Sequence, residues 1–370
     1  MPYKACKLPE YPCTCDMWDE LKNESRPIVI YGMGNGADKL IYRFDMLGIK
    51  FADIFASDGF VRGHSFHGIR VKSFSEIKQL YPEFVIALSF ASAREEVISM
   101  LEKINAEYDM YLPDMPVAEE TVYFDKEFYN ENYGKILAAY ELFEDEDSKN
   151  CYAAVVSYKL SGKINYLLDA FSEREDVFSL INSGCRIENM IDCGAYNGDT
   201  AREAINCLPS LKEIIAVEPD EKTYRKLKKY ADGEERVKVR AVKGALWEED
   251  ALGNFMSSGN RNSSVCATSS YEYKNREVDL ITLDGICDFR ADYIKYDVEG
   301  AEKEALFGSC HIIERDKPTL LVSVYHKSRD LFSLPLLINE KWGGYKLHLR
   351  RKRCLPAWEI ELIAISCADT

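Results

Sequence analysis

Residues 190–200 read MIDCGAYNGDT, and this stretch decides the fold of the C-terminal half of the chain. An apolar lead ends in Asp192, Gly194 and Gly198 follow four residues apart, and a helical pattern begins at about Asp199. A strand, a glycine turn and a helix in immediate succession are typical of the first βαβ unit of a parallel sheet. The stretch therefore predicts an α/β fold with a ligand site at a strand end.

A second strand completes this unit. The sequence IIAVEPD predicts an apolar strand that ends in Glu218, and a helical pattern follows it. A carboxylate at this position can accept hydrogen bonds from both hydroxyls of a ribose, and glycines in the first turn let the backbone approach a ligand closely. The unit indicates a nucleoside site, with turn glycines in a ligand-free fold as the alternative.

Charge distinguishes two nucleoside ligands. The carboxylates of Asp192 and Asp199 would repel the pyrophosphate of a dinucleotide, whereas a ligand with a cationic sulfonium and an α-amino group tolerates them. This pattern favours S-adenosylmethionine over NAD in the C-terminal half.

A smaller Rossmann-like domain is predicted over residues 25–112. An apolar strand precedes Gly32, Gly34 and Gly36, and a second strand ends at Asp58, at about the interval where a dinucleotide fold places its ribose-binding acid. Alternating strands and helices then predict a parallel sheet with right-handed crossovers. These residues either bind a nucleotide or form only a tight turn. The stretch resembles the N-terminal domains of bacterial sugar-modifying proteins related to nucleotide-sugar-binding folds.

The length of 370 residues favours two domains. We expect an N-terminal extension over residues 1–24, the smaller domain over 25–112, a helical linker and cover over 113–185, and a second domain over 186–370. An acidic run at residues 144–147 is expected to form a solvated helix face or a helix cap.

Composition limits the partners. A net charge of -15 disfavours nucleic acid. No apolar run suits a secretion signal or a membrane span, so a cytoplasmic location is expected, and the 12 scattered cysteines are expected to be reduced. Cys6, Cys13 and Cys15 lack a second ligand pair for zinc, so no metal is predicted. The basic run at 349–353 is expected to be a solvated strand edge, or else to meet an anionic acceptor.

Further motifs follow in the C-terminal half. RNSSV at 261–265 is expected in a polar loop, and ITLDGI at 281–286, DYIKYDVEGAEKEALFG at 292–308 and LLVSVYHKSRDLFSLPLLI at 320–338 come after it. Together with DCGAYNGDT and VEPD, these motifs resemble the FkbM family of S-adenosylmethionine-dependent methyltransferases. The resemblance spans about residues 140 to 367.

The resemblance implies a seven-stranded class I methyltransferase sheet whose last strand is antiparallel, and methyl transfer to a hydroxyl, often on a sugar or glycan precursor. It places Asp297, Glu299 and His326 at the reaction cleft as the catalytic residues. It also implies a set of cofactor contacts, with Glu218 on the ribose hydroxyls. The cofactor-binding residues would be Asp192, Gly194, Tyr196, Gly198, Asp199 and Glu218.

Methyl transfer to a neutral hydroxyl benefits from a positioned base. Our hypothesis is that His326 removes the hydroxyl proton, while Asp297 orients the acceptor or shares this role. Alternatively, His326 caps a strand end or binds a backbone carbonyl, and Asp297 and Glu299 cap the next helix. Glu302 is expected to be solvated or helix-capping.

Two other functions compete with methyl transfer. One is a nucleotide-sugar-binding or NAD(P)-dependent sugar-modifying protein whose chemistry lies in residues 25–112. That stretch lacks a Tyr-Lys or Cys-His arrangement near its glycines, so it favours a binding module. The other is a non-catalytic nucleotide sensor, which the presence of Asp192, Glu218, Asp297 and His326 disfavours. The acceptor is expected to be a saccharide or another hydroxylated small molecule.

Overall fold

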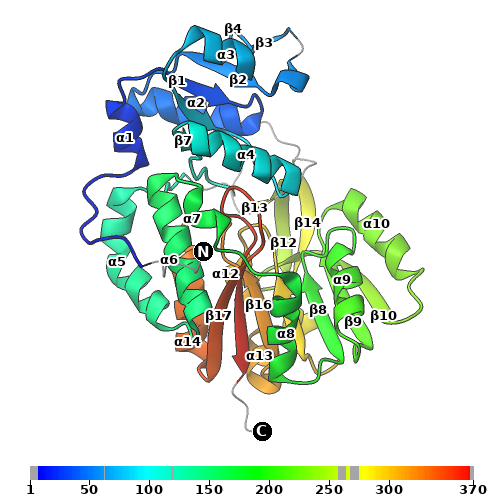
Figure 1. The fold of residues 1–370 in the computed structure, drawn as a ribbon. Coiled ribbons are helices and arrows are strands. Elements are labelled where there is room, and N and C mark those ends of the chain that lie inside the picture. The colour runs from blue at the N-terminus through cyan, green and yellow to red at the C-terminus, as the bar shows by residue number, and fades with distance from the viewer. Residues whose placement is uncertain (1–6, 62, 118–120, 257–263, 267–274, 367–370) are drawn as a thin grey trace.

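The structure is a computed structural model that describes residues 7–61, 63–117, 121–256, 264–266 and 275–366. A small sheet lies above a larger one in Figure 1, and helices cover both faces of each sheet. The α/β class with two Rossmann-like units is confirmed. Among the described helices, none is long and apolar enough to cross a lipid bilayer. Nine cysteines of the described part are free thiols.

The N-terminal sheet has five parallel strands in the order β5-β2-β1-β6-β7. Its strands are β1 (Ile28–Tyr31), β2 (Asp53–Ala56), β5 (Lys72–Ser73), β6 (Val85–Leu88) and β7 (Met110–Tyr111). Its helices are α1 (Met17–Asn23), α2 (Asn35–Leu47), α3 (Phe74–Leu80) and α4 (Glu95–Glu107), and a short 3-10 helix η1 (Asp58–Phe60) and a hairpin of β3 (Ser65–Phe66) and β4 (Ile69–Arg70) complete the unit.

Alternation along the strands explains the two covered faces of this sheet. Ile28 and Ile30 pack against α1 and α2, whereas Val29 and Tyr31 belong to the core that contains α3 and α4. Successive side chains of a strand point to opposite faces, so a strand that is buried throughout needs a layer on each side.

Four helices connect the two sheets. They are α5 (Lys126–Glu141), α6 (Glu146–Ser161), α7 (Asn165–Leu168) and α8 (Arg174–Gly184). Asp145 caps α6 by accepting a hydrogen bond from the Ser148 amide at 2.7 Å. Its carboxylate also contacts His348 and Arg350, so this member of the acidic run caps a helix as expected and ties that helix to the larger sheet.

The larger sheet has seven strands in the order β10-β9-β8-β15-β16-β18-β17. They are β8 (Asn189–Cys193), β9 (Glu213–Glu218), β10 (Lys238–Lys243), β15 (Tyr293–Tyr296), β16 (Thr319–Ser323), β17 (Tyr345–Arg351) and β18 (Ile360–Ser366). The last strand, β18, is antiparallel to both of its neighbours, and the remaining pairs are parallel. The predicted seven-stranded sheet with an antiparallel last strand is confirmed.

Helices cover both faces of this sheet (Figure 1). One face packs against α8, α9 (Asp199–Cys207) and α10 (Glu221–Ala231). The other packs against α5, α6, α12 (Glu302–Phe307), α13 (Cys310–Asp316) and α14 (Asp330–Trp342). Because both faces are buried, the central strands read as continuous apolar runs in the sequence.

A separate four-stranded sheet was not predicted. Its order is β11-β14-β12-β13, with β11 (Ala245–Leu246), β12 (Ala251–Met256), β13 (Ser264–Cys266) and β14 (Asn275–Ile281), and α11 (Leu283–Ile286) follows it. RNSSV was expected in a polar loop. Its first three residues, 261–263, lie outside the described residues, and Ser264 and Val265 belong to β13, so the loop prediction is wrong for these two.

The two sheet units share an apolar core. The face of the small sheet that carries α3 and α4 is continuous with the core around α5, α6 and α14. Ser92 and Leu355 also exchange two backbone hydrogen bonds, of 2.7 and 2.9 Å. Leu355 lies in the loop after β17, and β17 runs in the same direction as β16. The N-terminal unit is therefore fixed to the carboxyl edge of the larger sheet.

The basic run at 349–353 is not a solvated strand edge, so that expectation is wrong. Arg351 is 1% exposed, and its guanidinium donates to the backbone carbonyls of Leu167, Ala170 and Cys354. Lys352 pairs with Glu359 at 2.8 Å. The run instead anchors the helical segment to the sheet.

Candidate active site

Four parallel strands of the larger sheet end at one edge, and the predicted site residues gather there. Gly194 follows β8, Glu218 ends β9, Asp297 follows β15 and His326 lies shortly after β16. The carboxyl ends of parallel strands are where ligands bind in open α/β sheets.

The two glycines of the first turn are required by packing. Gly194 has a φ of +85°, and a β-carbon there would lie 1.9 Å from the Asp297 carbonyl oxygen. Gly198 has a φ of +84°, and a β-carbon there would lie 2.4 Å from the Tyr230 ring. Both positions use the left-handed region that favours glycine. The turn thus brings the ends of β8 and β15 together, in addition to any approach it allows to a ligand.

Glu218 is joined to this turn. Its carboxylate is 7% exposed and accepts hydrogen bonds from the backbone amides of Tyr196 and Asp220, at 3.0 and 2.9 Å. Burial raises the pKa of Glu218 to about 7. Tyr196 itself has a φ of +48° and an exposed side chain. The predicted ribose acid and the glycine turn therefore form one structural unit.

Asp192 and Asp199 differ in their surroundings. Asp192 is fully buried, and neither of its carboxylate oxygens has a hydrogen-bond partner among the described residues. Burial raises the pKa of Asp192 to about 6, although Lys295 at 3.7 Å opposes this. Asp199 is exposed in the first turn of α9 and accepts from the Thr200 amide at 3.0 Å.

Lys295 links Asp192 to the catalytic candidates. Its ammonium lies 3.2 Å from the Asp297 carboxylate. Burial lowers the pKa of Lys295, but Asp297 and Asp192 outweigh it and hold this pKa above its usual value. Burial raises the pKa of Asp297, but Lys295, His326 and a hydrogen bond from Ser323 hold it below its usual range. Both groups are therefore charged at neutral pH.

His326 is buried beneath carboxylates. Its side chain is 1% exposed, and Nδ1 lies 2.9 Å from Glu302 Oε1. Its Nε2 lies 3.7 Å from Asp297 Oδ1 and 3.5 Å from Glu299 Oε2. Burial lowers the pKa of His326, but the three carboxylates outweigh burial and raise it to about 10.

Glu299 and Asp297 are the more exposed members of this group. Their side chains are 33% and 26% exposed, respectively. Burial raises the pKa of Glu299 to about 8, although His326 opposes this. Glu299 also has a φ of +56°, a conformation that is uncommon for a residue with a side chain.

Glu302 is a residue of the candidate site that the sequence motifs do not single out. It is 1% exposed, so the expectation that it is solvated is wrong. Its Oε1 accepts hydrogen bonds from the amides of Val298 and Gly300, at 3.0 and 3.3 Å, as well as contacting His326. A carboxylate in the first turn of a helix directly after a strand end was the available signal, but only the fold shows that His326 meets it.

Three of these side chains form a candidate metal-ligand set. Asp297, Glu302 and His326 each offer one ligand atom within 4.8 Å of the others. Lys295 already pairs with Asp297, and Glu302 Oε1 already accepts two backbone hydrogen bonds. These existing partners compete with a metal ion for the same oxygens. That no metal binds here stays a prediction.

The N-terminal glycines form a second, separate group. A β-carbon on Gly32 would lie 2.5 Å from Ser89 Oγ, and one on Gly36 would lie 2.0 Å from the Ser89 carbonyl oxygen, whereas Gly34 has open space. Asp58 accepts hydrogen bonds from the amide and hydroxyl of Ser75, at 3.2 and 2.6 Å. The tight packing supports the turn interpretation, and nucleotide binding here stays a prediction.

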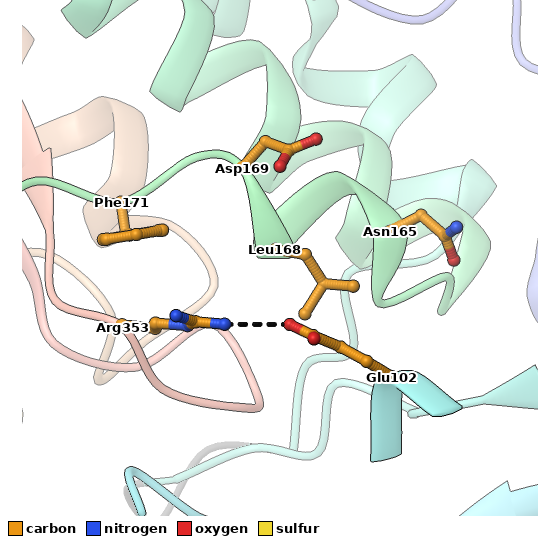
Figure 2. Close-up of a pocket in the computed structure, with 6 residues that line it drawn as sticks. All are labelled: Glu102, Asn165, Leu168, Asp169, Phe171 and Arg353. Carbon is orange, nitrogen blue, oxygen red and sulfur yellow. Dashed lines mark hydrogen bonds and ion pairs between the residues drawn. The ribbon is translucent and has the colours of Figure 1, made fainter. Parts of the chain in front are cut away.

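A cavity of about 460 Å³ lies between the units (Figure 2). Its lining comes from α4, α7, the segment after α7 and the loop after β17. The lining residues are Glu102, Asn165, Leu168, Asp169, Phe171 and Arg353. The Arg353 guanidinium lies 2.9 Å from Glu102 and 5.1 Å from the Phe171 ring centre. These contacts belong to the interface between the two units.

The strand order with an antiparallel last strand, the glycine turn and the acid at the tip of β9 define a Rossmann-like methyltransferase fold. Residues 192–340 match the family model described as the methyltransferase FkbM domain. This part of the chain is therefore a methyltransferase domain of the FkbM family, and the resemblance seen in the sequence is confirmed.

The fold extends beyond that domain. The solved structure of methyltransferase FkbM from Methylobacillus flagellatus KT superposes with a TM-score of 0.69 at 18% identity, over 97% of this chain and 94% of that one. Both units thus share their fold with that protein.

Two more distant solved structures are also similar to part of the chain. One is a putative caffeoyl-CoA O-methyltransferase from Staphylococcus aureus, with a TM-score of 0.32 at 14% identity, over 55% of this chain and 87% of that one. The other is Aeropyrum pernix fibrillarin with natively bound S-adenosyl-L-methionine, with a TM-score of 0.29 at 14% identity, over 48% of this chain and 66% of that one. No curated protein is significantly similar in sequence.

Proposed function

We propose that this protein transfers a methyl group from S-adenosylmethionine to a hydroxyl of a saccharide or glycan precursor. The observation that carries the proposal is the gathering of Asp297, Glu299 and His326 at the sheet edge that also holds the glycine turn and Glu218. Polysaccharide biosynthesis in the cytoplasm would be the setting.

The residues at the first two strand ends suit this cofactor. Glu218 would accept the ribose hydroxyls, and Gly194, Tyr196 and Gly198 would lie along the methionine side with Asp199. Buried Asp192, whose carboxylate oxygens lack hydrogen-bond partners in the described part of the chain, would favour a cationic ligand. When bound, S-adenosylmethionine supplies an electrophilic methyl group on a sulfonium.

The chain's own residues would then orient the acceptor and remove its proton. A displacement at the methyl carbon requires the acceptor oxygen in line with the bond that breaks, so positioning is the main demand. A neutral hydroxyl is a weak nucleophile, and a positioned base contributes about 10²–10⁴-fold. Asp297, Glu299 and His326 are the groups proposed for orientation and proton removal.

The choice of acceptor rests on the family resemblance. The N-terminal unit would recognise the sugar donor or its carrier, since it lies against the carboxyl edge of the larger sheet. The alternative is a nucleotide-sugar-binding or NAD(P)-dependent protein with its chemistry at Gly32, Gly34, Gly36 and Asp58.

Isothermal titration with S-adenosylmethionine, S-adenosylhomocysteine, NAD and UDP-sugars tests the cofactor. We expect binding of the first two, loss of that binding in Glu218→Ala, and no response to NAD. Incubation with labelled methyl donor and a bacterial surface-glycan extract tests the acceptor. Absence of sulfonium binding, together with a Glu218→Ala variant that equals wild type, would overturn the proposal, and a nicotinamide response would favour the alternative.

A further inference from the structure

We infer that Glu299 is the catalytic base of this methyl transfer, and that Glu302 is the positioning residue that acts on it through His326. The inference rests on the proposed function, since it names the proton acceptor of that same reaction. It differs from the expectation drawn from the sequence, in which His326 removes the proton.

Exposure separates the three candidate bases. His326 is 1% exposed and its Nε2 is buried, so an acceptor hydroxyl cannot reach this nitrogen without displacing its neighbours. Glu299 is 33% exposed and Asp297 is 26% exposed. A general base must come within hydrogen-bond reach of the proton it abstracts. The two carboxylates therefore meet this condition and the imidazole does not.

Existing contacts separate the two carboxylates. Both oxygens of Asp297 are engaged, because Oδ1 accepts from the Ser323 hydroxyl at 2.8 Å and Oδ2 accepts from Lys295 at 3.2 Å. In the described part of the chain, the charged partner within ion-pair distance of Glu299 is His326, at 3.5 Å. Glu299 thus keeps an oxygen for a substrate proton, whereas Asp297 is suited to orientation.

Glu302 fixes the imidazole on which Glu299 depends. Its Oε1 lies 2.9 Å from His326 Nδ1, so the proton on Nδ1 is directed at Glu302 and Nε2 is turned toward Glu299. Carboxylates that accept from one ring nitrogen orient the other one in this way. The Tyr325 ring also packs on the imidazole, with ring centres 4.1 Å apart.

Glu302 also fixes the backbone that carries Glu299. It accepts the amides of Val298 and Gly300, one on each side of Glu299. Glu299 and Gly300 have φ values of +56° and +96°. A residue with a side chain adopts this region only when its surroundings impose it, and such residues cluster at active sites. One buried carboxylate therefore holds both the bend and the histidine behind it.

The acceptor oxygen forms a bond to the methyl carbon, and the carbon–sulfur bond breaks with its electron pair left on sulfur. The hydroxyl proton passes to Glu299 in its ionised form, which prevails above about pH 8 because burial raises the pKa of Glu299 to about 8, and Glu299 becomes a neutral acid. His326 neither gains nor loses a proton in this step. Among the described residues, the charged groups within ion-pair distance of His326 are Asp297, Glu299 and Glu302, and Lys295 pairs with Asp297.

The test compares Glu299→Gln, Glu302→Gln and Glu302→Ala with wild type, and uses Glu314→Gln, an exposed glutamate on α13, as the matched control. Calorimetric titration with S-adenosylhomocysteine should give affinities within about threefold of wild type for all four variants. Transfer of labelled methyl to the glycan extract should fall about 10²–10⁴-fold in kcat for Glu299→Gln, with KM nearly unchanged.

The Glu302 variants report on positioning. Glu302→Ala should lower kcat about ten- to a hundredfold. Glu302→Gln keeps an oxygen that can accept from Nδ1 and should recover most of this loss. Nitrogen-15 NMR of the His326 ring requires no methyl acceptor. It should show the signal of a protonated Nδ1 in wild type and Glu302→Gln, and a changed Nδ1 signal in Glu302→Ala.

Each failure has its own signature. If wild type binds no S-adenosylhomocysteine and transfers no methyl, the proposed function fails. If wild type transfers methyl and Glu299→Gln matches it, or if the His326 ring is the same in wild type and Glu302→Ala, this inference alone is overturned. If circular dichroism shows that Glu302→Ala is unfolded, the kcat of Glu299→Gln alone tests the inference: a kcat equal to that of wild type overturns it.

Discussion

Gly194 lies against Asp297 so closely that a β-carbon on the glycine would stand 1.9 Å from the aspartate carbonyl oxygen. This contact joins the turn proposed for the cofactor to the segment proposed for catalysis. The two functions therefore depend on one backbone arrangement, which neither DCGAYNGDT nor DVEGAE reveals alone.

Replacing Gly194 with Ala should disturb both the turn proposed for the cofactor and the segment proposed for catalysis. The new methyl would force the end of β15 away, and the φ of +85° would become strained, so we expect a loss of about 2 kcal/mol or more in the free energy of unfolding. Urea denaturation measures this. Gly134→Ala is the control, because that glycine lies inside α5 with open space around it, and alanine there should be neutral or stabilising by about 0.5–1 kcal/mol. Equal stability of both variants would contradict the packing role.

Much of the site could be predicted because its geometry follows from strand order. Asp192, Glu218, Asp297 and His326 each lie at or just after a strand end, and parallel strands bring those ends to one edge. Such placement needs only the apolar runs and the polar residues that follow them.

The burial of charged side chains could not be predicted, because it depends on contacts between segments that are distant in the sequence. Arg351 is buried because carbonyls of Leu167 and Ala170 accept its hydrogen bonds, and no local pattern distinguishes it from a solvated arginine. Glu302 is buried because His326 arrives from the next strand. The burial of a charged group is decided by its partners, and these become neighbours only in the fold.

The pH dependence of cofactor binding should reflect Glu218. Burial raises its pKa to about 7, so the folded protein without ligand holds an extra proton between about pH 4.5 and pH 7. Stability from this proton is present at low pH and is lost as the pH rises through that window. Ribose binding needs the carboxylate, so affinity for S-adenosylhomocysteine should fall up to about tenfold per pH unit below 7. Titrations at pH 6, 7 and 8 measure this, and Glu218→Gln should bind weakly and without that dependence. A flat wild-type profile would argue against a ribose role for Glu218.

Asp145 should make a large contribution to stability. It caps α6 and contacts His348 and Arg350 of β17. Although burial raises the pKa of Asp145, these hydrogen bonds hold it well below its usual value, so its stabilising effect is present above about pH 4 and is lost as the pH falls further. Asp145→Ala should cost about 2–4 kcal/mol at pH 7 and less near pH 3. The exposed neighbour Asp147→Asn serves as control, and a pH-independent deficit would contradict the charged role.

Methyl transfer should proceed without a metal ion. Lys295 already neutralises part of the charge on Asp297, and Glu302 already holds His326 and two backbone amides. Activity should therefore survive dialysis against EDTA and should not rise with added Mg²⁺. An activity that EDTA removes and Mg²⁺ restores would instead assign Asp297, Glu302 and His326 to an ion. Manganese electron paramagnetic resonance would confirm that assignment if the signal of protein-bound Mn²⁺ appears in wild type and is lost in His326→Ala.

Arg353 should hold the N-terminal unit against the larger sheet. Figure 2 shows it pointing at Glu102 of α4, and it also pairs with Glu95 at 3.1 Å. These pairs are partly exposed, so Arg353→Ala should cost only about 0.5–1.5 kcal/mol in global stability. Its effect should concentrate at the junction, where the Ser92 amide bonds to the Leu355 carbonyl. Hydrogen exchange followed by mass spectrometry should show faster exchange there, while α9 and α10 stay unchanged. If the junction exchanges at the same rate in wild type and Arg353→Ala, the shared apolar core alone fixes the two units.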